Sequence, residues 1–533
     1  MKKYPGIAFK ISIFLTVLFS IYLFNIRIST GGDDAGYIES AKLFLDGIRY
    51  PSYHGAFYSI FLSFFIWIFG INLSILKLTS LLFITGHIIF FYYAFKNQIR
   101  DIILIPVLLF TCVNSEILYY ASQTYTEAIY MFMQSLLFFL IIKKYEFDDS
   151  YKLVKNHWAV VLAVGFILFG MSLTRNIGVI TLLSLLVYLI LQKKYYLSGY
   201  TLLSFLFFKL SFGLYKSLVW GLEKSDISGA VSKILYADFY NPTAGNEDLS
   251  GILIRVLENI QLYFSKYFLE VLGFGSLEGS GFIALLICVL FIVGFVIAYK
   301  KEPVMKFTAI YLILSLGGLF IAIQSKIGQM RLIVVYVPLM LLLFLWTIIT
   351  AKKSHKLMSL INYAAVFVIV IFTMINLSNS IKESRENKSI LLSNINGNMY
   401  SGYSQDWINY LKLSKYAAEN IPEGSMIACR KPSMSFIYGN GRNFYGIYRS
   451  DQPDSLTKRL VDNNVDYLLV ASLRSNPDKK TDQVITTIHR YGYYLNNKYP
   501  GIFELVYQVG ANDDEPARLY KINWDKIKII SNE

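Results

Sequence analysis

The chain has 533 residues, of which 55% are hydrophobic and only 16% charged, and its formal net charge is +14. Soluble globular domains carry about 25% charged residues, so this composition excludes a soluble protein and indicates a polytopic helical membrane protein. The positive charge does not indicate nucleic-acid binding, because the basic residues gather in short loops between apolar segments, as they do in cytoplasmic loops of membrane proteins. The three scattered cysteines suggest neither a disulfide framework nor a thiolate metal site.

Several apolar segments approach or exceed the roughly 20 residues that cross a bilayer, and shorter ones lie beside them. We predict spans, the first one retained rather than cleaved, at about 8–26, 73–95, 101–120, 125–142, 157–177, 178–192, 197–220, 280–299, 304–324, 331–350 and 357–378. The basic loops fall on one side of the membrane only if the short apolar segment 56–70 does not cross it. We therefore predict that 56–70 lies in or dips into the outer interface. If it crosses instead, the N-terminus lies outside.

This topology places the first loop, the 221–278 loop and the C-terminal tail on the outer face. Within the long loop, residues 251–272 keep a helical apolar stripe that charged residues interrupt, which predicts an interfacial helix rather than a span. From about residue 380 the composition becomes that of a soluble domain. There we predict a small α/β domain with strands at 425–429, 465–470 and 503–506 and helices at 406–419 and 455–462. The expected domains are thus 1–379 in the membrane and 380–533 outside it.

The stretch from Gly31 to Tyr37, which follows the first span, reads Gly-Gly-Asp-Asp-Ala-Gly-Tyr. The two glycines permit a sharp turn, and the residues after them have the spacing of an amphipathic helix at a membrane surface. An Asp before a helix commonly caps its backbone N–H groups. Capping explains one of the two carboxylates but not both, so we predict that Asp33 and Asp34 act on a substrate. Tyr37 is either a substrate contact or an aromatic-belt anchor.

Further polar residues occur at the predicted outer ends of other spans, namely His54, Glu127, Arg175, Lys326 and Arg331. Charged groups near membrane depth are costly and tend to be functional, so we predict that these residues bind a lipid phosphate and its sugar. Each has a structural alternative. Glu127 can stabilise the start of its own helix, and Arg175 can snorkel to lipid headgroups. Lys326 and Arg331 can bind headgroup phosphates without specificity, and His54 can be a plain interfacial residue.

The sequence contains no Walker loop, no dinucleotide-binding glycine fingerprint and no HExxH motif. It resembles the GT-C membrane glycosyltransferases, specifically the bacterial relatives of protein O-mannosyltransferases and aminoarabinose transferases. The residues that carry the resemblance extend over nearly the whole chain: Gly32 to Tyr37 with Ala41 and Gly47, Tyr50-Pro51, Phe69-Gly70, Thr126-Glu127, Leu173 to Gly178, Arg331 with Pro338, and Cys429 to Pro432, Gly441-Arg442 and Val465 to Tyr467 in the tail.

The resemblance implies an inverting transferase that uses a polyprenyl-phosphate sugar. Asp33 would be the general base on the acceptor hydroxyl, with Asp34 as its neighbour or substitute. Arg175, Lys326 and Arg331 would hold the donor phosphate. The family's His-Pro-Pro stretch is degenerate here, because Gly55 and Ala56 follow His54. Some relatives use a divalent metal and others do not, so we predict no metal and no other cofactor.

We accordingly expect a multi-pass protein of the bacterial plasma membrane, with its active site and tail on the outer, periplasmic side. Its partners would be a lipid-linked sugar donor, a glycan, lipid or protein acceptor, and membrane lipids. Three alternatives stay open. One is a polymerase or ligase that joins lipid-linked oligosaccharides. The second is a secondary transporter, against which the sequence shows neither paired half-chain symmetry nor helices broken in matching positions. The third is a non-catalytic scaffold, and the two adjacent carboxylates at the membrane edge argue against it.

Overall fold

The structure is a computed structural model that describes residues 4–52, 55–145, 155–221, 234–238, 245–275, 279–324, 328–350, 356–447, 453–473, 487–510 and 515–530. The chain divides into two compact units. The first comprises Met1–Phe24, His54–Tyr58 and Leu78–Lys388, and the second comprises Asn25–Tyr53, Ser59–Lys77 and Ser389–Glu533.

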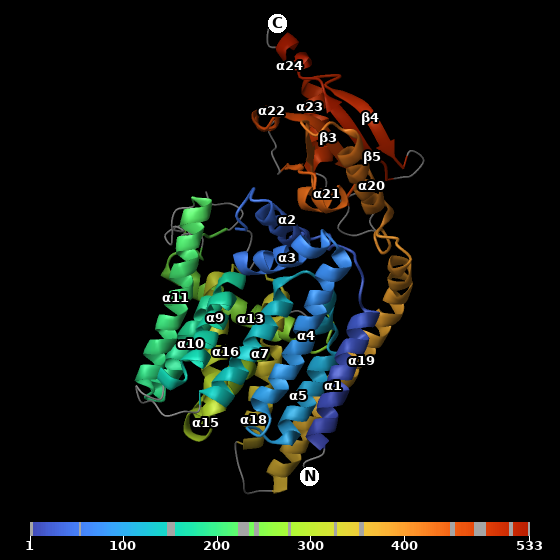
Figure 1. The fold of residues 1–533 in the computed structure, drawn as a ribbon. Helices are drawn as coiled ribbons and strands as arrows, with labels where there is room; N and C mark the ends of the chain where they lie inside the picture. The colour runs from blue at the N-terminus through green and yellow to red at the C-terminus, as the bar shows by residue number, and fades with distance from the viewer. Residues whose placement is uncertain are drawn as a thin grey trace. The chain divides into compact units, whose positions relative to one another are not determined.

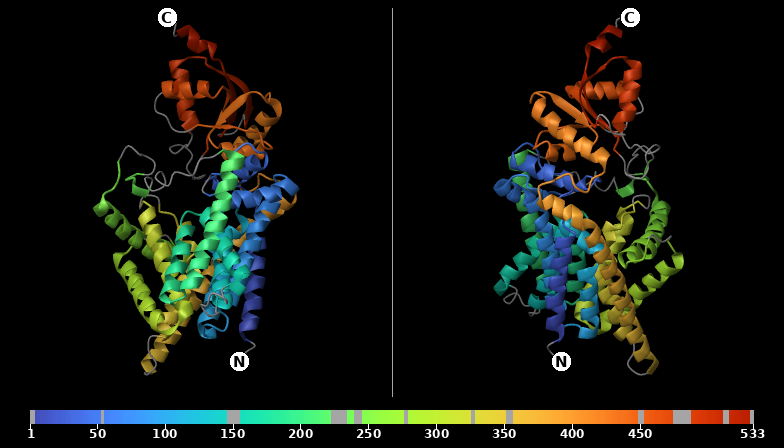
Figure 2. Two further views of the ribbon diagram at one scale, coloured as in Figure 1. Left: turned by 60° about the vertical axis from the view of Figure 1, so that its left-hand side comes forward. Right: turned by 90° about the vertical axis from the view of Figure 1, so that its right-hand side faces the viewer.

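The first unit is a helical bundle, and most of its helices run side by side in Figure 1 and in both views of Figure 2. α9 packs on α7 and α11, α10 on α16, α1 on α5, and α15 on α18. Its elements are α1 (Tyr4–Tyr22), α4 (Leu73–Phe95), α5 (Asp101–Val113), α6 (Ser115–Tyr119), η1 (Tyr120–Ser122), α7 (Thr126–Lys144), α9 (Trp158–Thr174), α10 (Gly178–Leu191), α11 (Tyr195–Trp220), α13 (Leu249–Leu262), η3 (Tyr263–Tyr267), α14 (Phe268–Val271), α15 (Gly281–Lys301), α16 (Pro303–Ala322), α17 (Arg331–Val334), α18 (Val337–Thr350) and α19 (Lys356–Ile395).

Helices occupy all eleven ranges in which the sequence predicts spans. Among the described residues, seven helices are long and apolar enough to cross a membrane, and eight if the bent pair α5–α6 counts as one. Four shorter apolar helices accompany them: α3 (Ala56–Phe69), α9, α10 and α18. The chain is therefore a multi-pass helical membrane protein. α3 coincides with the segment predicted not to cross, and its position relative to the membrane stays a prediction.

Two predicted elements differ in detail. The span at 101–120 is bent by 49° between α5 and α6. Asn114 stabilises the break, since its Oδ1 accepts the Ile117 backbone N–H at 3.0 Å and its Nδ2 donates to the Val271 carbonyl at 2.7 Å. In the helix at 249–271, Arg255 does not face outward. It is buried and forms an ion pair with Glu247 at 2.7 Å.

The second unit contains a five-stranded mixed sheet of order β2-β1-β3-β5-β4. β1 pairs in parallel with β2 and β3, whereas β5 is antiparallel to both β3 and β4. A core of Leu460, Val465, Leu468, Leu495 and Ile502 supports it. The unit also contains α3 from Ser59 on and the start of α4 to Lys77. Its remaining elements are α2 (Asp33–Leu45), α20 (Gln405–Asn420), β1 (Met426–Cys429), α21 (Pro432–Tyr438), β2 (Tyr445–Gly446), α22 (Pro453–Asp462), β3 (Val465–Ala471), α23 (Thr487–Lys498), β4 (Phe503–Val509), β5 (Ala517–Ile522) and α24 (Asp525–Ile530).

All three strands and both helices predicted for the tail are present, as β1, β3, β4, α20 and α22. The predicted domain boundary between residues 379 and 380 lies inside α19, which contains no proline or glycine over its 40 residues. The second unit also includes α2 of the first loop, which packs against α21 of the tail.

Candidate active site

The two first-loop carboxylates occupy different environments at the start of α2. The N-cap of this helix is Gly32, which has a left-handed backbone (φ 90°) and offers no side-chain cap. Asp33 and Asp34 therefore lie in the first helical turn, where the positive end of the helix dipole favours both charges. Asp33 is half-buried and Asp34 fully buried. Capping alone does not account for either residue.

Asp34 closes the loop that precedes its own helix. It accepts hydrogen bonds from the Ser29 backbone N–H at 2.8 Å, the Ser29 hydroxyl at 3.0 Å and the Ala35 backbone N–H at 2.9 Å. Burial raises the pKa of Asp34 above its ordinary value, while the positive charge of Lys77 and the bonds from Ser29 oppose this rise. These contacts give Asp34 a structural role whether or not it also acts in catalysis.

Lys77 is a member of this site that the sequence reasoning missed. It is the last residue of α4 that belongs to the second unit, is fully buried and donates a hydrogen bond to the Arg27 carbonyl. Its charge acts on Asp34, and a buried ammonium is stable only beside such a counter-charge. The sequence does contain one indication of this role, because Lys77 is the only lysine in the apolar segment 73–95.

Lys431 of the tail contacts the same loop, which precedes α2. The Lys431 ammonium donates to the carbonyls of Thr30 at 2.7 Å and Gly31 at 3.2 Å. Burial lowers the pKa of Lys431 to about 8, Arg430 adds to this effect, and the charges of Asp33 and Asp34 oppose it. Lys431 is thus a cation that interacts electrostatically with Asp33 and Asp34. It belongs to the tail motif Cys429 to Pro432, which carries part of the family resemblance.

Two more tail residues fix the loop and α2. The Tyr403 hydroxyl accepts the Ile28 backbone N–H at 2.7 Å and donates to the Ile28 carbonyl at 2.8 Å. The Ser433 hydroxyl donates to Glu39 of α2 at 2.6 Å. Because these contacts join residues almost 400 positions apart, no local pattern in the sequence predicts them. Tyr37, on the same helix, is 3% exposed, so it packs inside this unit.

The first unit contains a second charged group, built on an ion pair between Glu127 and Arg175. Glu127 lies in the first turn of α7, and Arg175 is the extended residue that ends α9. Gly178 makes the turn after α9 tight, because a Cβ there would lie 2.1 Å from the Met171 carbonyl oxygen. Arg175 Nη1 lies 3.4 Å from Glu127 Oε1, with the side chains 13% and 1% exposed. The structure thus brings together two of the residues that the sequence predicts.

This ion pair leaves one carboxylate oxygen without a partner. Glu127 Oε2 is buried and forms no hydrogen bond in the part of the chain that the structure describes. A buried acceptor of this kind is costly unless something donates to it. The Arg175 guanidinium also lies over the Tyr130 ring, with its Cζ 5.7 Å from the ring centroid. The pair therefore presents a cation and an unused acceptor side by side, which suits a phosphate next to a hydroxyl-bearing group.

A buried tyrosine cluster lies behind Arg175. The Tyr130 hydroxyl is 3.5 Å from the hydroxyls of both Tyr311 and Tyr336, and Gln134 donates to Tyr311 at 2.8 Å. These side chains come from α7, from α16 and from the turn before α18, so three segments of the chain fix the ring on which Arg175 lies. All three tyrosines are fully buried, so they are neither lipid-facing nor interfacial belt residues.

Arg331 belongs to the same unit. Its Nε donates to Gln329 at 2.6 Å, and its Cζ lies 5.8 Å from the ring centroid of Tyr125. The Tyr263 hydroxyl accepts the backbone N–H of Gln329 at 3.3 Å. Burial raises the pKa of this phenol to about 12, and the charges of Arg175 and Arg331 oppose the rise. Tyr263 opens a π-helical segment between α13 and α14, and such segments occur frequently at functional sites.

Two predicted site residues, His54 and Lys326, lie outside the described residues. In the described ranges, no group of three or more His, Cys, Asp or Glu side chains could hold a metal ion. The expectation that the protein uses no metal stays a prediction.

No family model and no curated protein matches this sequence. Its fold, however, matches solved structures. ArnT from Cupriavidus metallidurans bound to undecaprenyl phosphate is 12% identical, with a TM-score of 0.55 over 97% of this chain and 98% of that chain. The archaeal oligosaccharyltransferase AglB from Archaeoglobus fulgidus, in complex with an inhibitory peptide and a dolichol-phosphate, is 11% identical, with a TM-score of 0.51 over 88% and 69%. At these identities the likeness concerns the fold, and it confirms the GT-C resemblance at that level.

Proposed function

We propose that this protein is an inverting glycosyltransferase that moves a sugar from a polyprenyl-phosphate donor to an acceptor hydroxyl on the outer face of the bacterial plasma membrane. The fold supports a lipid-phosphate donor, because ArnT is bound to undecaprenyl phosphate and AglB to a dolichol-phosphate in structures that share it. The topology derived from the basic loops supports the outer face.

The observation that carries the proposal is the Glu127–Arg175 pair. A guanidinium matches a phosphate through two parallel hydrogen bonds, and Arg175 is anchored by a carboxylate and an aromatic ring rather than free to move. In this proposal Arg175, assisted by Arg331 and Lys326, stabilises the charge that develops on the departing phosphate. The unpartnered Oε2 of Glu127 accepts a hydrogen bond from a hydroxyl of the donor sugar.

The first-loop carboxylates supply the base. A carboxylate at hydrogen-bond distance removes the proton of the acceptor hydroxyl as its oxygen attacks the anomeric carbon. The bond between this carbon and the phosphate oxygen breaks on the opposite side, so the configuration inverts and the polyprenyl phosphate leaves. We assign the base to Asp33, because its side chain is only half-buried, whereas Asp34 is fully buried.

A second candidate is the transfer of a lipid-linked oligosaccharide in place of a single sugar. The likeness to the oligosaccharyltransferase AglB favours it. Both candidates use the same cationic group and the same base. They differ in the size of the group transferred, which the mass of the product reports directly.

The test is a transfer assay with the purified full chain in lipid nanodiscs. We would supply radiolabelled polyprenyl-phosphate sugars or lipid-linked oligosaccharides with a membrane extract as the source of acceptors, and use nucleotide sugars as the control donors. We expect release of polyprenyl phosphate and a labelled product from a lipid-linked donor only. Transfer from a nucleotide sugar, or no turnover of any lipid-linked donor by a folded protein, would contradict the proposal.

A further inference from the structure

An apolar groove lies between α9 and α11 in the first unit. Its volume is about 260 Å³, and its lining includes Trp158, Val161 and Leu162 of α9, Leu203 and Phe207 of α11, and Lys155 at one end. Pockets for drug-sized ligands have volumes of roughly 300–1,000 Å³. This groove is therefore suited to a segment of a hydrocarbon chain rather than to a bulky ring system.

The packing of the two helices explains the groove. They approach each other tightly at Gly165, where a Cβ would lie 2.0 Å from the Ser204 hydroxyl. One turn further on, the Phe169 ring lies 6.3 Å from the Phe208 ring. Because both contacts advance by four residues on each helix, α9 and α11 run in the same direction. Their N-terminal ends therefore lie together, and larger side chains, among them Trp158, Leu203 and Phe207, line the groove.

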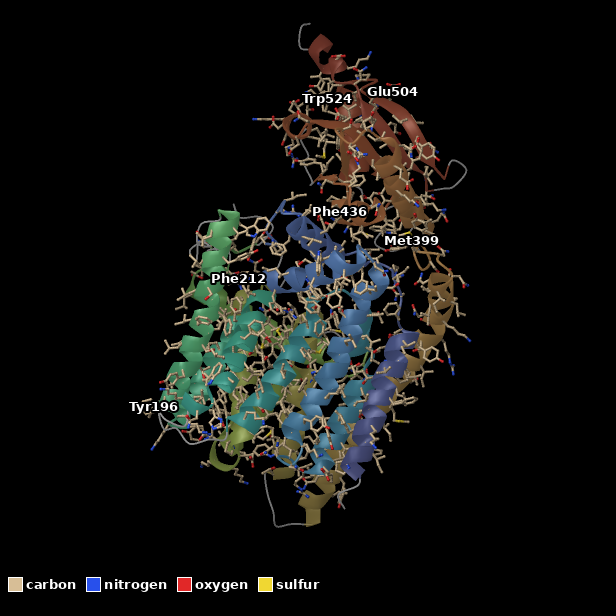
Figure 3. The ribbon with its side chains drawn as sticks, viewed as in Figure 1. Tyr196, Phe212, Met399, Phe436, Glu504 and Trp524 are labelled. Carbon is tan, nitrogen blue, oxygen red and sulfur yellow. The ribbon has the colours of Figure 1, made fainter. Side chains whose placement is uncertain are left out.

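That end of the groove has the residues of a membrane interface. Trp158 is 63% exposed and Tyr195 and Tyr196 are 62% and 55% exposed. Figure 3 labels Tyr196 near the start of α11 and Phe212 further along it. Trp and Tyr concentrate where the bilayer meets water. Lys155 is exposed at the same end, so the groove leads from a basic, aromatic mouth into a mainly apolar region in which Ser204 and Tyr200 are the polar lining residues.

We propose that this groove binds an anionic phospholipid, with an acyl chain between α9 and α11 and its phosphate at Lys155. Burial of the chain does not by itself select a lipid, because bilayer tails are as apolar as the groove. Selection must come from the headgroup, and a lysine at the interface favours an anionic one. Under the topology derived from the basic loops, this mouth is cytoplasmic. The site is thus separate from a donor phosphate used on the outer face.

The test compares lipid retention by the purified full chain in detergent, measured by native mass spectrometry. The probes are phosphatidylglycerol and phosphatidylcholine with identical acyl chains. We expect the wild type to prefer phosphatidylglycerol by about fivefold, the effect of one interfacial lysine, and Lys155→Gln to lose this preference. Leu203→Trp, which fills the groove from an exposed position, should lower the retention of both lipids.

The matched control is Lys300→Gln, which removes an exposed lysine at the end of α15. It should leave the preference unchanged. The proposal fails if Lys155→Gln retains the full preference for phosphatidylglycerol. It also fails if Lys300→Gln reduces this preference as much as Lys155→Gln does, because the preference then arises from the general surface charge. It also fails if Leu203→Trp blocks the retention of undecaprenyl phosphate but not of phosphatidylglycerol, because the groove then holds the donor's tail.

Discussion

Exchanging each first-loop carboxylate for its amide should separate catalysis from stability. Asp33→Asn keeps the size of the side chain but removes its ability to accept a proton. We expect transfer to fall by roughly 10²–10⁴-fold, the usual contribution of a positioned acid or base. Stability should change by no more than about 0.5 kcal/mol, because Asp33 is only half-buried in the first turn of α2.

Asp34→Asn should behave in the opposite way. The amide oxygen can still accept from Ser29, but the fully buried Lys77 loses its counter-charge. Removing one partner of a buried charge pair costs about 3–5 kcal/mol, so this variant should unfold at a clearly lower temperature. Adding Lys77→Met to Asp34→Asn should restore part of the loss, since the double variant no longer contains an isolated buried charge.

The assay measures thermal unfolding and transfer from a polyprenyl-phosphate sugar on the same nanodisc samples. It should be run with excess donor, so that weakened binding is not mistaken for a lost base. Wild-type turnover by Asp33→Asn would refute the assignment of the base to Asp33. If Asp34→Asn is as stable as the wild type but inactive, the two roles are reversed.

Four further predictions follow from the same contacts and from the topology. Arg175→Lys should raise the donor KM more than it lowers kcat, because lysine lacks the bidentate fork, and steady-state kinetics with varied donor would show it. A cysteine at Asn97 should resist an impermeant thiol reagent added from outside, since the loop that contains it is predicted to be cytoplasmic. Residues 395–533, expressed alone, should unfold cooperatively in denaturant, because the sheet has its own core. Lys431 has a pKa of about 8 against an ordinary 10.5, so its neutral form favours the folded state. Wild-type thermal stability should thus rise between pH 8 and 10.5 relative to Lys431→Met.

The sequence predicted the helices well because membrane spans depend on local apolar composition. All eleven predicted ranges are helical, and in the tail the alternation of apolar residues was enough to find β1, β3 and β4. The end of α19 was not predictable from the same information. The sequence turns polar near residue 380, but polar residues without proline or glycine continue a helix, and this one runs to Ile395. Composition marks where a segment leaves the membrane, not where its helix ends.

Of the candidate site, the sequence predicted only the residues that lie in short local motifs. Asp33, Asp34, Glu127 and Arg175 were each predicted from motifs at the ends of predicted spans, but the ion pair between Glu127 and Arg175 was not. The partners that distinguish Asp34 from Asp33 were not predicted, because Lys77 is 43 residues away and Lys431 almost 400. The buried tyrosines near Arg175 were missed for a related reason. An aromatic residue in an apolar helix has the same local pattern whether it faces lipid or another helix.

The segment between α1 and α2 has no regular secondary structure, so holding it still requires contacts from elsewhere. Ordering each of its residues costs roughly 1–2 kcal/mol of backbone entropy, and a single net hydrogen bond returns only about 1 kcal/mol. Several bonds are therefore needed, and they come from three sources: Asp34 at the loop's own end, Lys77 of α4, and Tyr403 and Lys431 of the tail. A base is effective only when its position is fixed. The tail therefore serves the proposed reaction by immobilising the loop before Asp33.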